Sequence, residues 1–350
     1  MGTALPPDAP GSSVRPQPAP PRVPQAEKAG GAVVSLIGNH ELMLVRGQHH
    51  YVEPGAWSEG TAAASDLFAA SVEAAAAPGA LSGILPAPTT PARARDALAH
   101  LALWSPGGPL AAELGARSLI GVAVDDTLFG HAGAIPTWLV KLGPRTLSDV
   151  NAATSAWLAG APPPDYLSTD VLRRGAGGPG VEVALSSPYG PVWTRAFAGR
   201  PVTRGNEVGL DYVAEAECAL LHATLAEATA EWARAHLANP ASVPPPPARG
   251  LRRMVVGHTP QLGRATSGCE GRLIRLDTAM SAKMALPGFG SGPPTALELV
   301  WSGGVGDDDD GLRDATLIQN QVGTPQTKIE VPLEEARVVI DTRRDPSELR

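Results

Sequence analysis

Three short apolar runs, each followed by a glycine and a polar motif, form the most regular pattern along the chain. They cover residues 33–37, residues 120–124 with 128–129, and residues 254–256. Such a run is typical of a buried strand that delivers the next polar side chain to the edge of a sheet. The motifs that follow are Gly38-Asn39-His40-Glu41, Gly130-His131-Ala132-Gly133 and Gly257-His258-Thr259-Pro260. We therefore predict three strand ends that carry asparagine and histidine.

The rest of the pattern predicts a mixture of helices and strands. The clearest helix covers residues 211–238, where apolar residues recur every three or four positions and form one face. Other predicted helices cover residues 41–46, 61–77, 92–103 and 145–159. Other predicted strands cover residues 273–277, 297–300, 329–331 and 338–340, and predicted loops cover residues 175–180 and 303–311. This alternation favours the α/β fold class.

Composition separates a proline-rich start from a globular remainder. Residues 1–30 contain proline, alanine and polar residues without periodicity, so we predict that they are disordered. The whole chain is 43% hydrophobic but only 4% aromatic, and it contains 39 glycines and 36 prolines, which indicates a compact core with flexible insertions. We expect one large domain over residues 31–303 and a C-terminal extension over residues 304–350.

The net charge and the cysteine content limit the possible binding partners and the cellular compartment of the protein. The net charge of −7 gives no basic surface for nucleic acid or for an anionic membrane. No apolar run reaches the roughly 18 residues that span a bilayer, and the start of the chain does not resemble a secretory signal. Cys218 and Cys269 form no metal or redox motif, so a reducing compartment is the default. We predict an intracellular protein, in the cytoplasm or alternatively in an organelle such as the chloroplast.

Asparagine and histidine at three strand ends are candidate ligands of a single metal ion. Asn39 offers a neutral carbonyl oxygen, and His131 and His258 offer neutral imidazoles. A lone histidine after an apolar run is usually a core residue, and residues 38–41 alone could form an Asx-type turn. The repeated setting, in the order Asn, His, His, favours the metal site.

Four further residues are candidates for catalysis or for support of the site. His40 could donate a proton to a leaving alkoxide, and Glu41 could hold the turn by accepting backbone N–H bonds. The guanidinium of Arg195 fits a phosphate or sulfate, although an exposed solubilising arginine is the alternative. Asp277 could orient His258 through a hydrogen bond, or it could form a turn.

These motifs and their flanks resemble the phosphoprotein-phosphatase branch of the calcineurin-like metallophosphoesterases, and more narrowly the Shewanella-like protein phosphatases. The segments that carry the resemblance are residues 36–43, 129–136, 191–195, 255–260 and 276–281. Together they extend over roughly residues 32 to 302. The resemblance implies a β-sandwich of two mixed sheets flanked by helices.

The resemblance also implies roles for the candidate residues. Asn39, His131 and His258 would be ligands of the second metal of a two-metal site. His40 would protonate the leaving serine, threonine or tyrosine oxygen, and Arg195 would clamp the phosphate. A metal-activated water would attack phosphorus in line. The cofactor would be a divalent metal such as manganese, iron or zinc.

The chain departs from the family pattern before Gly38. The two opening motifs of the family, Gly-Asp-x-His-Gly and Gly-Asp-x-x-Asp-Arg-Gly, have no matching segment. They would supply the first metal site and the aspartate that bridges the two metals. We therefore expect an N-terminally incomplete family fold with at most one well-formed metal site. The predicted function is a metal-dependent phosphoester hydrolase acting on a phosphoprotein or a small phosphoester. The alternative is a catalytically inactive pseudophosphatase that binds phosphate or a partner.

Overall fold

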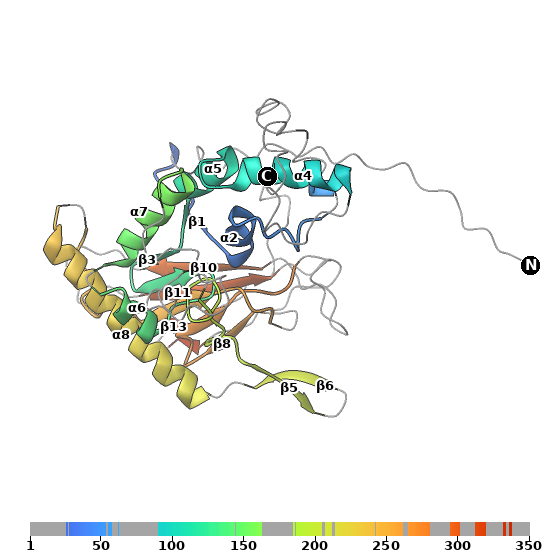
Figure 1. The fold of residues 1–350 in the computed structure, drawn as a ribbon. Helices are drawn as coiled ribbons and strands as arrows, with labels where there is room; N and C mark the ends of the chain where they lie inside the picture. The colour runs from blue at the N-terminus through green and yellow to red at the C-terminus, as the bar shows by residue number, and fades with distance from the viewer. Residues whose placement is uncertain are drawn as a thin grey trace, which may run out of the picture. The chain divides into compact units, whose positions relative to one another are not determined.

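The structure is a computed structural model of the 350-residue chain, drawn in Figure 1. It describes residues 26, 28–53, 55–57, 62, 90–143, 145–162, 185, 187–204, 207–211, 214–241, 243–261, 265–280, 295–301, 312–319, 332–333 and 336–337. The chain forms two compact units, residues 1–35 and residues 36–350, and the candidate site belongs to the second. Six predicted segments lie wholly or almost wholly outside the described residues: the disordered start 1–30, the helix 61–77, the loops 175–180 and 303–311, and the strands 329–331 and 338–340.

A mixed five-stranded sheet supports the candidate site. Its strands, in spatial order, are β3 (Gly121–Val124), β4 (Thr127–Gly130), β7 (Arg253–Val256), β9 (Leu273–Arg275) and β8 (Thr266–Gly268). The central strands β4, β7 and β9 are parallel, whereas β3 and β8 pair antiparallel at the two edges. All residues of β7 and β9 are buried, which explains why both strands are continuous apolar runs broken only by buried arginines.

Shorter strands complete the β structure. They are β1 (Ser35–Leu36), β2 (Ser118–Leu119), the pair β5 (Arg200–Arg204) and β6 (Glu207–Asp211), the pair β10 (Thr295–Trp301) and β11 (Leu312–Gln319), and the pair β12 (Pro332–Leu333) and β13 (Ala336–Arg337). The strand predicted over 297–300 lies inside β10. Strands β5 and β6 were not predicted, because each is short and contains only one or two large apolar residues.

Several helices accompany the strands in the described residues of the second unit, besides a helical stretch at residues 55–57. They are α2 (Asn39–Val45), α4 (Pro91–Trp104), α5 (Pro109–Arg117), α6 (Pro136–Lys141), α7 (Leu147–Leu158) and α8 (Ala214–Ala238). Helices α5 and α7 pack together, and α6 packs against α8, which runs beside the sheet (Figure 1). Helix α5 lies within residues 59–118, which the alanine-rich sequence predicts to be helical in pieces, whereas α6 was not predicted. Both helices are short and begin with proline, which favours the first helical position. The predicted start of the long helix was wrong, because Asp211 belongs to β6.

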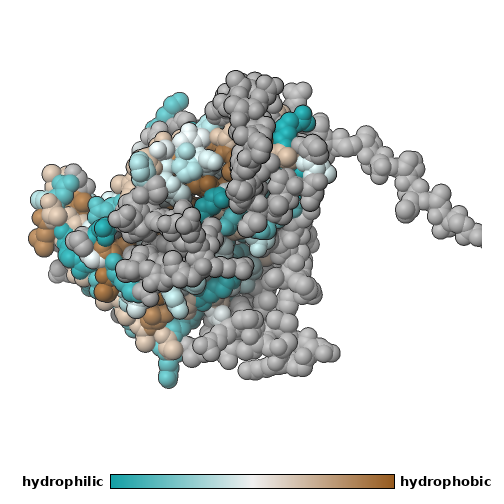
Figure 2. All heavy atoms as spheres, viewed as in Figure 1, coloured by the Kyte–Doolittle hydropathy of each residue, from teal (hydrophilic) through white to brown (hydrophobic). Residues whose placement is uncertain are grey.

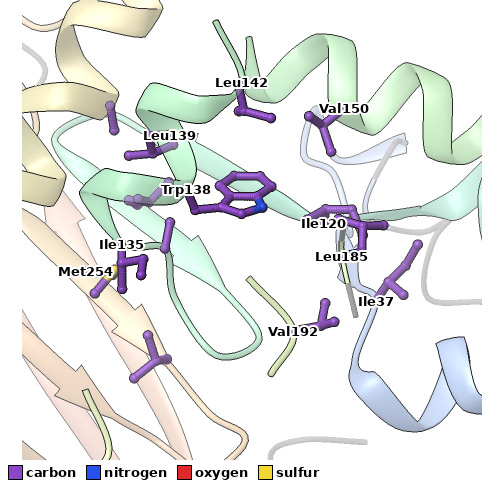
Figure 3. Packing of buried hydrophobic residues seen from close by; sticks show 14 of the residues in the cluster. Ile37, Ile120, Ile135, Trp138, Leu139, Leu142, Val150, Leu185, Val192 and Met254 are labelled. Carbon is purple, nitrogen blue, oxygen red and sulfur yellow. The ribbon is translucent and has the colours of Figure 1, made fainter. Parts of the chain in front are cut away.

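The core surrounds the fully buried indole of Trp138 on α6. Figure 3 shows this side chain among apolar residues of the helices and of the chain around Ile120 and Val192. Ile120 and Val192 are both 0% exposed. Burial of a large aromatic side chain contributes several kcal/mol through the hydrophobic effect and packing, of which area removal alone gives roughly 1.5–3 kcal/mol. Residues next to the site motifs, such as Ile37 and Val256, belong to this core, so the core holds the segments that carry the candidate site.

A disulfide joins Cys218 on α8 to Cys269 in the turn between β8 and β9. Their Cα atoms lie 5.3 Å apart, and 51 residues separate them along the chain. The sequence carries no metal or redox motif at these cysteines, and their pairing was not predicted from it. Their spacing gives no signal, because disulfide partners are brought together by the fold and not by sequence proximity. The predicted cellular compartment stays a prediction.

Polar and apolar residues are interspersed over the described surface on the face shown in Figure 2. None of the helices in the described part of the chain is long and apolar enough to cross a membrane.

Candidate metal and phosphate site

Two neighbouring parallel strands bring His131 and His258 to the same edge of the sheet. Gly130 at the end of β4 is in register with Val256 at the end of β7, and the N–H of Gly257 donates to the carbonyl oxygen of His131 at 2.8 Å. The carboxyl ends of parallel strands meet at one edge, which is where ligands bind in open α/β sheets. The two histidines follow these ends directly, although 127 residues separate them.

Asn39 reaches the same place from the first residue of α2. The N–H of Ile37 donates to the carbonyl oxygen of Leu119 at 2.8 Å, which ties the chain before α2 to β2. The carboxylate of Glu41 accepts the N–H of Gly38 at 2.9 Å, as the sequence predicts, and this bond closes the turn at the start of the helix. The predicted helix over 41–46 begins two residues earlier than expected, so Asn39 itself lies in its first turn.

Three side-chain atoms converge at this edge. Nε2 of His131 lies 2.9 Å from Oδ1 of Asn39 and 3.2 Å from Nδ1 of His258, and the latter two atoms are 3.2 Å apart. These three atoms cannot form hydrogen bonds in all three pairs. The carbonyl oxygen only accepts, and each of the two ring nitrogens carries either a proton or a lone pair, so at least one of the three contacts joins two acceptors or two donors. Ligands around a cation with bonds of about 2.1 Å lie roughly 3.0–3.4 Å apart. The three atoms therefore fit one face of a metal coordination shell.

Both imidazoles are held in the neutral form that binds a cation. Burial lowers the pKa of His131, although the negative charges of Glu41 and Asp277 oppose this effect. Burial also lowers the pKa of His258, to about 4, and the positive charges of His131 and Arg195 act in the same direction. Neutral imidazole is the ligand form of histidine, so no proton has to be displaced at pH 7.

The backbone of His258 adopts an uncommon conformation. Its φ angle is +66°, in the left-handed region that favours glycine. A residue with a Cβ atom pays roughly 1–2 kcal/mol there. Strain of this kind persists where the surrounding structure enforces it, and it clusters at functional sites. Here it directs the imidazole of His258 toward Asn39 and His131.

His40 stands exposed beside the three converging atoms. Its positive form lowers the pKa of both His131 and His258, which shows that the ring lies within electrostatic range of both. Its ring stacks on that of Tyr51, with centroids 4.6 Å apart and an angle of 6° between the planes. The stack fixes the orientation of an exposed imidazole that would otherwise rotate freely. The sequence pattern gave no reason to expect this role of Tyr51.

Arg195 lies within electrostatic range of His258. One guanidinium nitrogen, Nη1, donates to Oγ1 of Thr259 at 3.0 Å, and the side chain is exposed. The indole of Trp193 meets the ring of His258 edge-on, with centroids 5.9 Å apart. The guanidinium is thus anchored near His258 while its remaining N–H donors are available to a ligand, as a phosphate clamp requires.

Asp277 makes a turn. Its Oδ1 atom accepts the N–H of Ala279 at 3.0 Å, and its backbone carbonyl accepts the N–H of Gln261 at 2.7 Å. Within the described part of the chain no hydrogen bond joins its carboxylate to His258, so the expected bond is wrong and the turn alternative holds. Its remaining influence on the site is electrostatic, because its charge raises the pKa of His131.

The ligand set contains no carboxylate among the described residues. No group of three or more His, Cys, Asp or Glu side chains in that part of the chain is placed to hold a metal. The convergent group differs because one of its three members is an asparagine. A cation held there would receive three neutral ligands, with open positions for water or a phosphate oxygen.

Gly38 tests how tightly this site is packed. A Cβ atom at this position would lie 2.7 Å from Oε2 of Glu41 and 2.9 Å from Cε1 of His131, although the φ angle of −97° suits any residue. Gly38→Ala should therefore displace the His131 ring and weaken zinc binding at least tenfold in calorimetric titration. Gly55→Ala is the control, because its Cβ meets nothing within 4 Å. Unchanged zinc affinity in Gly38→Ala would show that His131 is not held in place by this contact.

Comparisons with known proteins find distant relatives. Shewanella-like protein phosphatase 2 of Arabidopsis thaliana is 23% identical over 289 residues, which is 80% of this chain and 60% of that protein. An uncharacterized protein of Schizosaccharomyces pombe is 24% identical over 266 residues, which is 75% of this chain and 55% of that protein. No protein-family model and no solved structure matches the chain.

The chain is thus distantly related to a protein phosphatase. It spans little more than half the length of these relatives. The structure of this chain itself combines helices with a mixed sheet, which is an α/β architecture.

Proposed function

We propose that this protein is a metal-dependent phosphoester hydrolase of the phosphatase type, acting on a phosphoprotein or a small phosphoester. The convergence of Asn39, His131 and His258 at one sheet edge carries the proposal. The distant relationship to a Shewanella-like protein phosphatase supports it. The calcineurin-like β-sandwich of that family is part of the same proposal.

Asn39, His131 and His258 would hold a divalent cation such as manganese, iron or zinc. When bound, the cation would supply Lewis acidity at a phosphate oxygen and a more acidic water. Neutral ligands leave its charge undiminished, which favours an anionic substrate. The low pKa values of both imidazoles keep them available as ligands at neutral pH.

The remaining residues bind the phosphate and move a proton. Arg195, anchored by Thr259, can donate its free N–H groups to two phosphate oxygens. His40 is exposed and its ring is oriented by Tyr51, so it can give a proton to the leaving oxygen. Because the ring is already oriented, less conformational entropy is lost when the transition state forms.

Hydrolysis of two aryl phosphates with different leaving groups tests the role of His40. The purified chain with manganese should hydrolyse p-nitrophenyl phosphate and phenyl phosphate. His40→Ala should lower kcat by roughly 10²–10⁴-fold for a substrate that needs the proton. The loss should be larger for phenyl phosphate, because phenolate is the poorer leaving group.

The matched control is His50→Ala, which removes an exposed histidine of the same segment. Its kcat should stay within twofold of the unaltered chain. Equal loss for both substrates would argue against proton donation by His40. Absence of turnover, combined with phosphate binding that Arg195→Ala abolishes, would favour the alternative of a phosphate-binding pseudophosphatase.

A further inference from the structure

A cavity of about 540 Å³ lies behind the candidate site, between the sheet and helices α5 to α8. Its lining is largely apolar and includes Leu128 and Phe129 on β4 and the indole rings of Trp138 and Trp232. Small residues such as Ala152, which is exposed on α7, stand at its opening. This volume is within the roughly 300–1,000 Å³ of sites that bind small molecules.

One buried carboxyl group lines this apolar cavity. Glu231 on α8 is only 5% exposed. One of its oxygens, Oε1, accepts the backbone N–H of Leu147 at the start of α7. Among the described residues no lysine, arginine or histidine forms an ion pair with it. Arg234, whose charge acts on Glu231, pairs with Glu227 at 3.2 Å. A buried carboxylate without a cation is costly unless it takes up a proton or a ligand supplies a positive charge.

The surroundings of Glu231 favour a positive ligand. Burial raises the pKa of this carboxyl group to about 7, against the bond from Leu147 and the charge of Arg234, which lower it. The carboxylates of Asp149 and Glu227 raise it further. An ammonium group at this position would reverse the effect and stabilise the ionised carboxylate. A negative ligand would meet three carboxyl groups instead.

We propose that this cavity binds an amphipathic primary amine, whose ammonium group pairs with Glu231 while its hydrocarbon part fills the apolar lining. The cavity volume of about 540 Å³ is more than enough for a chain of about eight carbons. The site is separate from the three converging metal-ligand atoms, and the proposal does not depend on phosphatase activity. Gly130 and Gly133 line the cavity on either side of His131 in the sequence. A bound amine would therefore also contact the loop that carries the metal ligand His131.

Calorimetric titration with octylamine at pH 8 tests the proposal, with 1-octanol and octanoate as matched probes. Octylamine should bind at one site per chain, at least tenfold more tightly than either probe. Glu231→Gln keeps the acceptor for the Leu147 N–H but removes the charge, so it should lower octylamine affinity at least tenfold. Its affinity for 1-octanol should stay the same.

A second variant distinguishes the contribution of the apolar cavity from that of the Glu231 charge. Ala152→Phe places a ring at the opening without altering a buried position, and it should weaken both octylamine and 1-octanol. Circular dichroism confirms that each variant is folded. Equal binding of octylamine and 1-octanol, or unchanged octylamine affinity in Glu231→Gln, would overturn the ion pair. Absence of octylamine binding to the folded, unaltered chain would overturn the site itself.

Discussion

Replacing His258 with alanine should abolish binding of a single divalent cation to the purified chain. The variant removes one of three converging ligand atoms, which lie 2.9–3.2 Å from one another. Loss of an outer partner of a ligand costs roughly 10–100-fold in metal affinity, and loss of a ligand itself should cost more. Zinc titration followed by calorimetry measures this, with His222→Ala on α8 as the control that keeps the site.

A second substitution tests whether the three atoms coordinate a cation or only form hydrogen bonds with one another. Asn39→Asp keeps the size of the side chain and adds a negative charge to a set of neutral ligands. A metal site should gain zinc affinity, because carboxylate attracts a divalent ion more strongly than an amide does. If His258→Ala and Asn39→Asp both leave zinc binding unchanged, the convergent group is a hydrogen-bonded cluster and the ligand assignment is wrong.

Replacing Gly133 with alanine should destabilise the fold by about 2–5 kcal/mol, the sum of a backbone penalty and overpacking. The φ angle of Gly133 is +94°. Its Cβ atom would also lie 3.0 Å from Phe197 and 3.1 Å from Val256, in the core behind β7. Chemical denaturation monitored by circular dichroism gives the free energy of unfolding.

Gly143→Ala isolates the backbone part of this effect. Its φ angle is +66°, and nothing lies within 4 Å of the added Cβ atom. This control should lose only about 1–2 kcal/mol. If both variants lost the same amount, the close packing of Gly133 against Phe197 and Val256 would not contribute, and this part of the core would be looser than the distances indicate.

The position of the strands could be predicted because buried strands leave an apolar signal. The run over 254–256 is β7, and the polar residues after it do lie at a sheet edge. Short apolar runs carry this information because burial on both faces of a sheet requires apolar residues at every position. The pattern did not show that β4 and β7 are neighbouring parallel strands, which is what places His131 and His258 side by side.

Features that depend on pairing of distant, unlike residues could not be predicted. The stack of His40 on Tyr51 and the bond between Arg195 and Thr259 need positions that only the folded chain defines. Glu231 gave no sequence signal, because a glutamate on a long helix is normally solvated. Asp277 was ambiguous for a related reason: turn formation and support of a histidine both require only a carboxylate.

The bond between Cys218 and Cys269 makes the chain between them a covalent ring. Strand β7 and His258 lie inside this ring, as does the C-terminal part of α8. A cut in the backbone anywhere between residues 219 and 268 would therefore leave two fragments that stay joined by the disulfide, because each fragment contains one of the two cysteines. Separation of the strand that carries His258 from the rest of the molecule would need two events, one at the backbone and one at the sulfurs.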